Sequence, residues 1–363
     1  MEPLRILVVD DSAFSRKIIK DALSPLAEVE IVGMVSNGAD ALLRVAAVLP
    51  DIVTLDVEMP GMNGLEVLSA LQETGFAGAV VMLSSHTERG APFTIKALEL
   101  GAFDFMLKPS FASIEENFTA LRETFLPIAQ AVAQRKKINH LLRGGGLSLG
   151  HRRPEVAQAS RSDSFIGGYK GKAPSQIITI GVSTGGPKAL AQIIPKLTAA
   201  LAVPVVIIQH MPQGFTEEFA KSLNAKSSIT VKEAEDGELL LPGTVYVAPG
   251  GKQLKVTTRV LDKIFQITDD QPENNCKPSV DYFFRSVAQV YGSRATAVVL
   301  TGMGRDGAKG AQLMKSRGAK VIVQDEETSV VFGMPQAVID LGSADIVSPL
   351  QEIANLMCQN LID

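Results

Sequence analysis

Short apolar runs alternate with helical patterns along the first 126 residues. Between the runs, apolar residues recur with helical spacing over 12–23, 38–48 and 63–72. The runs themselves are four or five residues long, as expected for strands buried on both faces of a parallel sheet: Ile6–Val9, Ile31–Val35, Ile52–Leu55, Val80–Leu83 and Phe103–Leu107. Five β/α units in this order predict a doubly wound, flavodoxin-like domain with five parallel strands over residues 1–126.

The pattern changes between residues 127 and 172. This segment contains Arg135-Lys136-Lys137 and Gly144-Gly145-Gly146, followed by polar residues with few aliphatic ones. It cannot bury enough apolar surface to form its own core. We interpret it as a linker whose first third continues the preceding helix. Whether it only connects the domains or also transmits a signal stays open.

The β/α alternation resumes over residues 173–363. Longer apolar runs predict core strands at Ile177–Val182, Val203–Ile208, Ala295–Leu300 and Lys320–Val323. Shorter segments separated by Gly, Pro and Asp are typical of hairpin strands: Ile229–Lys232, Val245–Val247, Leu254–Val256 and Phe265–Ile267. The second domain is therefore predicted to be a doubly wound α/β domain with a small β-hairpin region inserted.

Bulk composition narrows the class of protein. A chain of 363 residues fits two domains, and 46% hydrophobic and 20% charged residues are ordinary for a globular protein. A net charge of −4 argues against nucleic-acid binding as the main function. Two cysteines are too few for a disulfide framework. No apolar run approaches the about 18 residues of a membrane span, and the apolar N-terminal run is too short for a secretory signal. We therefore expect a cytoplasmic protein.

Polar side chains gather at the predicted strand ends of the first domain. Asp10 and Asp11 follow the first strand and Asp56 follows the third, and these strands are neighbours in a doubly wound sheet. Three carboxylates there would repel one another without a cation, and Mg²⁺ is the simplest that fits oxygen ligands. Ser84 and Lys108 end the fourth and fifth strands. The set predicts phosphoryl transfer onto Asp56, with Lys108 and Ser84 holding the added phosphoryl group.

Residues 1–126 resemble the response-regulator receiver domain. The matching motifs are Val8-Val9-Asp10-Asp11-Ser12, Leu55-Asp56-Val57-Glu58-Met59-Pro60-Gly61-Met62-Asn63-Gly64, Met82-Leu83-Ser84-Ser85 and Lys108-Pro109. The resemblance implies that Asp56 is the phosphoacceptor and a histidine kinase the phosphodonor. It assigns Mg²⁺ to Asp11, Asp56 and the backbone carbonyl of Glu58, with Asp10 helping through water. Ser84 and Phe105 match the switch pair. Phe105 lacks the hydroxyl of the tyrosine that is frequent there, a departure that concerns the readout of the switch and not the phosphorylation.

The second domain offers one serine, one histidine and one aspartate at strand ends. Ser183 follows the strand at 177–182 in a glycine-rich turn before a helix, which resembles the position of a nucleophile elbow. Of four histidines only His210 belongs to this domain, and it follows the strand at 203–208. Asp306 follows the strand at 295–300. Asp306 could orient His210 while Ser183 loses its proton to the other ring nitrogen.

Two other functions compete with this interpretation. The Gly302–Gly307 loop also fits Gly-x-Gly-x-x-Gly, with Asp325 suitably downstream, so a dinucleotide-dependent oxidoreductase stays an alternative. Against it, Asp306 would stand beside the pyrophosphate at a helix N-terminus and repel it. The other alternative is a non-catalytic phospho-switch that acts by binding alone.

Residues 173–363 resemble the catalytic domain of the chemotaxis protein-glutamate methylesterases. The matching motifs are Gly181-Val182-Ser183-Thr184-Gly185-Gly186, Gln209-His210-Met211-Pro212, Lys277-Pro278-Ser279-Val280-Asp281, Leu300-Thr301-Gly302-Met303-Gly304-Arg305-Asp306-Gly307 and Val331-Phe332-Gly333-Met334-Pro335.

This second resemblance implies roles for five residues. It assigns the nucleophile to Ser183, the base to His210 and the aspartate to Asp306, with the Met303 N–H in the oxyanion hole and Thr184 as support. The expected enzyme is a phosphorylation-activated hydrolase that demethylates chemoreceptor glutamates, deamidates glutamines and needs no cofactor for hydrolysis. We further expect the unphosphorylated receiver domain to cover the site around Ser183.

Overall fold

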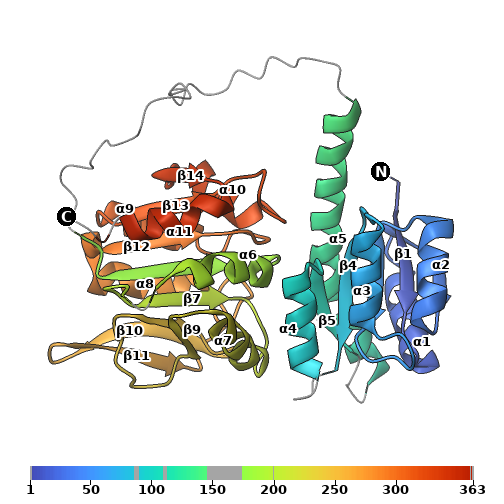
Figure 1. Ribbon diagram of the computed structural model, residues 1–363, viewed down its shortest axis with the longest axis horizontal. Coiled ribbons are helices and arrows are strands. Elements are labelled where there is room, and N and C mark those ends of the chain that lie inside the picture. The colour runs from blue at the N-terminus through green and yellow to red at the C-terminus, as the bar shows by residue number, and fades with distance from the viewer. Residues whose placement is uncertain are drawn as a thin grey trace.

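The computed structural model describes residues 2–85, 90–108, 113–144, 174–198, 200–359 and 361, without the side chains of 138–144. Two α/β units lie side by side, with the N-terminal unit on the right in Figure 1. Within these residues, no helix is both long and apolar enough to cross a membrane.

The N-terminal unit is a five-stranded parallel sheet in the order β2-β1-β3-β4-β5, which confirms the predicted fold. Helices α1 and α5 cover one face, and α2, α3 and α4 cover the other. The elements are β1 (Leu4–Val9), α1 (Ala13–Leu23), β2 (Val29–Val35), α2 (Gly38–Val48), β3 (Ile52–Asp56), α3 (Gly64–Glu73), β4 (Ala79–Ser84), α4 (Gly90–Leu100), β5 (Asp104–Leu107) and α5 (Ile114–Gly144).

Local sequence explains where these elements begin. Ser12 caps α1 by accepting a hydrogen bond from the Ser15 N–H, and Asn63 and Glu66 form a capping box at α3. Strand β3 is buried at every position, as a central parallel strand should be. Helix α5 continues into the predicted linker as far as Gly144, and residues 145–172 of that linker lie outside the described residues.

The C-terminal unit is built on a seven-stranded parallel sheet in the order β14-β13-β12-β6-β7-β9-β8. Helices α6, α7 and α11 cover one face, and α8, α9 and α10 cover the other. The elements are β6 (Ile177–Val182), α6 (Gly186–Ile193), η1 (Ile194–Lys196), β7 (Val205–Gln209), α7 (Phe215–Lys226), β8 (Thr230–Glu233), β9 (Thr244–Val247), β10 (Gln253–Arg259), β11 (Asp262–Thr268), α8 (Val280–Val290), η2 (Gly292–Arg294), β12 (Ala295–Val299), α9 (Ala308–Ser316), β13 (Lys320–Gln324), α10 (Gly333–Asp340), β14 (Ile346–Ser348) and α11 (Leu350–Gln359).

Only part of the predicted hairpin region is a hairpin. Strands β10 and β11 pair antiparallel from Gln253 with Thr268 to Arg259 with Asp262. Strands β8 and β9 instead extend the main sheet, because β9 pairs in parallel with β7 and β8 pairs in parallel with β9. The crossover through α7 brings β8 back to the edge of the sheet that contains β7. The periodicity of such short strands does not predict which strand they pair with.

The two units touch through α4 and β5 of the first and α6 and α7 of the second (Figure 1). Phe105 stacks on Phe215 with ring centroids 4.9 Å apart. The Thr184 hydroxyl donates to Asp104 Oδ2 at 2.6 Å. Glu99 of α4 accepts hydrogen bonds from the Ser222 hydroxyl, at 2.8 Å, and from the Lys226 ammonium. Aromatic, hydrogen-bonding and charged contacts therefore all hold the receiver unit against the second unit.

Candidate active site and phosphoacceptor pocket

Three neighbouring strands in the middle of the C-terminal sheet end at the predicted catalytic residues. Strand β6 lies between β12 and β7. Ser183 follows β6 directly, His210 follows β7, and Asp306 follows β12 by a short loop. The carboxyl ends of parallel strands meet at one sheet edge, so three segments far apart in the sequence converge there.

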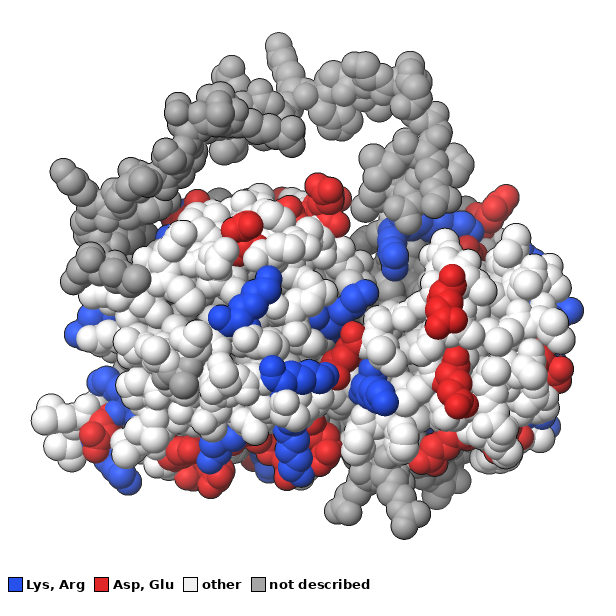
Figure 2. Space-filling model, in the orientation of Figure 1, with Lys and Arg blue, Asp and Glu red and all other residues white. Residues whose placement is uncertain are grey.

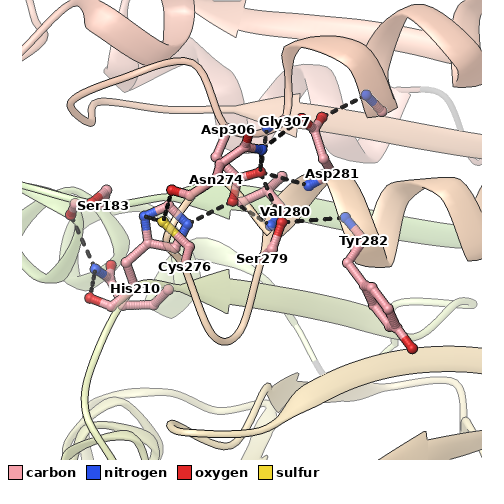
Figure 3. A network of polar contacts seen from close by, with 12 residues as sticks. Ser183, His210, Asn274, Cys276, Ser279, Val280, Asp281, Tyr282, Asp306 and Gly307 are labelled. Carbon is pink, nitrogen blue, oxygen red and sulfur yellow. Dashed lines mark hydrogen bonds and ion pairs between the residues drawn. The ribbon is translucent and has the colours of Figure 1, made fainter. Parts of the chain in front are cut away.

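His210 and Asp306 form a close pair. His210 Nε2 lies 2.9 Å from Asp306 Oδ2, and Asp306 is buried (Figure 3). The Asp306 carboxylate also accepts hydrogen bonds from the Ser279 hydroxyl, the Asn274 amide and the N–H groups of Val280, Asp281 and Gly307. Burial alone would raise the pKa of Asp306, but the His210 contact and these donors lower it below 3.8. Asp306 is therefore held as an anion in one orientation.

The other ring nitrogen of His210 faces a cysteine. Cys276 Sγ lies 3.6 Å from His210 Nδ1. Burial opposes the charged ring, but Asp306 and Cys276 outweigh it and raise the pKa of His210 to about 9. In this form the ring carries a proton near neutral pH, and it must lose that proton before it can act as a base.

The Ser183 turn is held by contacts that leave no room for larger neighbours. The Ser183 N–H donates to the Thr301 carbonyl at 3.1 Å, and the Gln209 amide donates to the Ser183 carbonyl at 3.1 Å. A Cβ at Gly302 would lie 2.9 Å from the Ser183 Cβ, so glycine is required there. Met303 follows Gly302, and Thr184 points to Asp104 of the receiver unit. The predicted nucleophile thus lies partly exposed beside the domain interface.

This geometry does not support a dinucleotide site in the Gly302–Gly307 loop. The Asp306 carboxylate accepts the Gly307 N–H at 3.1 Å, next to the start of α9. A pyrophosphate needs the N–H groups at a helix N-terminus, and a fixed anion there repels it. The oxyanion-hole assignment of Met303 and the supporting role of Thr184 stay predictions.

The receiver unit brings its predicted acidic residues together. Lys108 Nζ lies 2.7 Å from Asp56 Oδ2 and 3.2 Å from Asp10 Oδ2. Carboxylate oxygens of Asp10, Asp11 and Asp56 lie within 4.8 Å of one another. Asp10 and Asp56 are buried, whereas Asp11 is exposed. Burial raises the pKa of Asp56 to about 6, although Lys108 lowers it in part. Such an oxygen cluster, with one face open to solvent, fits a hard dication.

The predicted switch residues make contacts outside this pocket. The Ser84 hydroxyl donates to the Ser85 carbonyl at 3.2 Å and accepts from the Thr94 hydroxyl at 2.7 Å. Phe105 points into the domain interface against Phe215. The Glu58 N–H donates to Asp56 Oδ1 at 3.1 Å. Pro109, His86 and His151 lie outside the described residues, and the His140 side chain is not described either.

Sequence reasoning gave no role to several residues of the site. Asn274 bridges Asp306 and Asp281, and Cys276 contacts the predicted base. Asn274 and Cys276 lie in an irregular loop, in which Asn274 has a backbone φ of 54°. The sequence of such a loop has no periodic pattern that would predict its contacts. Ser279 and Asp281 belong to the motif Lys277-Pro278-Ser279-Val280-Asp281, which by itself implies no role for either residue. Gln209, next to the histidine, was the one neighbour whose place at a strand end could have drawn attention.

Comparisons with known proteins give both units relatives. The family model "CheB methylesterase" matches residues 178–357, and "Response regulator receiver domain" matches residues 6–118. A protein-glutamate methylesterase/protein-glutamine glutaminase of Desulfotalea psychrophila is 45% identical over 98% of this chain and 97% of its own length. One of Bacillus subtilis is 41% identical over 97% of this chain and 96% of its own length. The crystal structure of the Thermotoga maritima CheB methylesterase catalytic domain has 45% identity and a TM-score of 0.50, covering 52% of this chain and 99% of that chain.

Proposed function

We propose that this chain hydrolyses glutamate γ-methyl esters on chemoreceptor cytoplasmic helices. The chain belongs to the family of CheB methylesterases that carry a receiver domain. The products are glutamate and methanol. The same acyl chemistry would turn receptor glutamine into glutamate and ammonia, as the relatives' names indicate for those proteins. The observation that carries the proposal is the His210–Asp306 pair at the strand ends beside Ser183.

The reaction begins with attack of Ser183 Oγ on the ester carbonyl. His210 Nε2 faces Asp306, so Nδ1 is the nitrogen that takes the serine proton and later gives it to the departing methoxide oxygen, which leaves as methanol. Water then loses a proton to the same nitrogen and releases glutamate from the acyl-enzyme. Asp306 keeps a hydrogen bond to Nε2–H throughout, which fixes the tautomer and stabilises the charged ring.

The developing oxyanion needs donors near Ser183. Met303 follows Gly302, which packs against the Ser183 Cβ, so the Met303 N–H is the donor that we assign to the oxyanion. Thr184 follows the nucleophile in sequence and supports this side of the site. Its hydroxyl bonds to Asp104 when the receiver is docked.

The receiver domain would control this reaction through phosphorylation of Asp56 by a histidine kinase. We assign Mg²⁺ to Asp10, Asp11, Asp56 and the Glu58 carbonyl, where it would neutralise charge on the phosphoryl group. Lys108 already pairs with Asp56 and would hold the product. A phosphoryl group would compete for Lys108 and draw the Ser84 hydroxyl away from Thr94. Phe105 connects the receiver domain to the catalytic domain, because it stacks on Phe215. Weaker docking would then expose Ser183.

Methanol release from methylated receptor tests the proposal. Wild type, Ser183→Ala and Asp56→Asn are each assayed with and without a small-molecule phosphodonor in excess Mg²⁺. We expect Ser183→Ala to release no methanol above background and Asp56→Asn to keep the basal rate without activation. Undiminished release by Ser183→Ala would refute the mechanism, and activation of Asp56→Asn equal to that of wild type would refute the switch.

A further inference from the structure

His210 has a second neighbour that hydrolysis does not use. Cys276 Sγ lies 3.6 Å from Nδ1, on the side of the ring opposite the Asp306 contact (Figure 3). His210, Cys276 and Asp306 each offer one ligand atom within 4.8 Å of the others. Both His210 and Cys276 are partly exposed, and about 15% of the His210 side chain reaches solvent. A solvated ion can therefore approach this pair.

The spacing of the two ligand atoms suits a tetrahedral ion that prefers nitrogen and sulfur. Zinc binds histidine nitrogen at about 2.0 Å and cysteine sulfur at about 2.3 Å, which at a tetrahedral angle separates the two atoms by about 3.5 Å. The distance from Nδ1 to Sγ is 3.6 Å. The two ligand atoms therefore already have the separation that a bound zinc ion requires. A hard ion such as Mg²⁺ prefers oxygen ligands and would not compete here.

Asp306 would serve this ion indirectly. Its two oxygens already accept hydrogen bonds from five donors besides His210, so the carboxylate is not free to turn toward a metal. It does accept from Nε2, and histidines that bind metal usually donate their other ring N–H to a carboxylate. The Asp306–His210 pair thus has the arrangement that supports a metal at Nδ1.

We propose that Zn²⁺, or a soft divalent ion like it, binds between His210 Nδ1 and Cys276 Sγ and switches the hydrolase off. The inhibition rests on the proposed function, because the ion takes the lone pair that would accept the Ser183 proton. On binding, the Cys276 thiol and Nδ1 of the charged His210 ring each lose a proton to the buffer, and waters fill the remaining positions of the tetrahedron. The site is then an inhibitory one at the general base.

The first test measures inhibition of the full chain. Methanol release is followed with saturating phosphodonor, excess Mg²⁺ and increasing ZnCl₂, with and without a chelator. We expect wild type to lose more than 90% of its activity, reversibly, and Cys276→Ala to need at least about tenfold more zinc for half-inhibition, since removal of a ligand weakens binding at least as much as removal of its supporting residue. Cys358→Ala is the matched control, because Cys358 lies in α11 and is the only other cysteine. It should behave as wild type.

The second test detects the metal without activity. Co²⁺ bound by a thiolate gives a sulfur-to-cobalt charge-transfer band, which oxygen ligands in the receiver pocket cannot produce. We expect the band in wild type, Cys358→Ala and the hydrolytically inactive Ser183→Ala, and its loss in Cys276→Ala and His210→Ala. A band in Ser183→Ala keeps the metal site separate from the proposed function if the latter fails. Absence of the band in wild type, its persistence in Cys276→Ala, or equal zinc inhibition of wild type and Cys276→Ala would overturn the proposal.

Discussion

The ion pair between Lys226 and Glu99 should set part of the basal activity. Glu99 lies on α4 of the receiver and has a side chain only 8% exposed, whereas Lys226 ends α7 of the catalytic domain and is 44% exposed. Lys226→Met keeps the length of the side chain and removes the charge. The Glu99 carboxylate then stays nearly buried with the Ser222 hydroxyl as its remaining partner from the catalytic domain among the described contacts. Docking of the two domains should weaken.

The size of the effect follows from the exposure of the two partners. A hydrogen bond to a charged group contributes about 1.5–3 kcal/mol when buried, and an exposed ion pair about 0.2–1 kcal/mol. This pair lies between those cases, so we expect a loss of about 1–1.5 kcal/mol. That corresponds to about five- to twelvefold weaker docking. Without phosphodonor, methanol release should rise by the same factor, up to the phosphodonor-saturated rate, and the fold-activation should fall accordingly.

Lys221→Met supplies the matched control for this prediction. Lys221 lies on the same helix, but its ion pairs are with the exposed Glu217 and the partly exposed Glu218 of α7 itself. It should leave both rates unchanged. The exchange of charges, Glu99→Lys with Lys226→Glu, should restore a low basal rate. A wild-type basal rate in Lys226→Met, together with a phosphodonor-saturated rate that shows an intact hydrolase, would mean that this ion pair does not stabilise docking.

Three further predictions concern buried charges. Asp306→Asn removes the anion behind His210 and should lower kcat about 10³- to 10⁴-fold with little change in KM; a loss under tenfold in steady-state methanol release would contradict the mechanism. Burial of the Asp104 carboxylate in the docked receiver domain raises its pKa above 3.8, so the docked form binds a proton more readily. Docking therefore weakens as the pH rises through that pKa. Basal methanol release, relative to the phosphodonor-saturated rate, should therefore be lowest in mildly acidic buffer, and a pH dependence unaltered by Asp104→Asn would argue against this. Lys108→Met leaves two buried carboxylates without their cation, so Mg²⁺ should raise its Tm more than that of wild type; equal Mg²⁺-induced shifts in thermal melting would exclude the shared site.

Much of the site followed from where short apolar runs stop. Ser183, His210 and Asp306 each come after such a run, and parallel strands in one sheet bring their carboxyl ends together. The same argument holds for Asp10 and Asp56 in the receiver. Hydrophobicity alone marks these runs in the sequence. The two sheets and most strand bounds were therefore predictable to within a few residues.

Contacts made by irregular loops were not predictable in this way. Asn274 and Cys276 reach His210 and Asp306 from a segment in which Asn274 and Asn275 have φ values of 54° and 59°. No periodicity marks such a segment, and its side chains are aimed by backbone conformations that sequence propensity treats as rare. The pairing of β9 with β7 was also not predictable, because the length of a short strand does not show which edge of a sheet it joins.

The contacts that join the two domains were not predictable from periodicity either, and several of them come from strand β5. Asp104 and Phe105 are consecutive residues of β5, with Lys108 of the acidic pocket at the end of the same strand. Asp104 bonds to Thr184, the residue after the nucleophile, and Phe105 stacks on Phe215 at the start of α7. One strand therefore touches both the phosphoacceptor pocket and the Ser183 turn. If Asp56 is phosphorylated as proposed, a small shift of β5 would strain both interface contacts at once, because packed interfaces repack in discrete steps instead of deforming smoothly. By this route a charge added at Asp56 would act on Ser183 without any contact between the two residues.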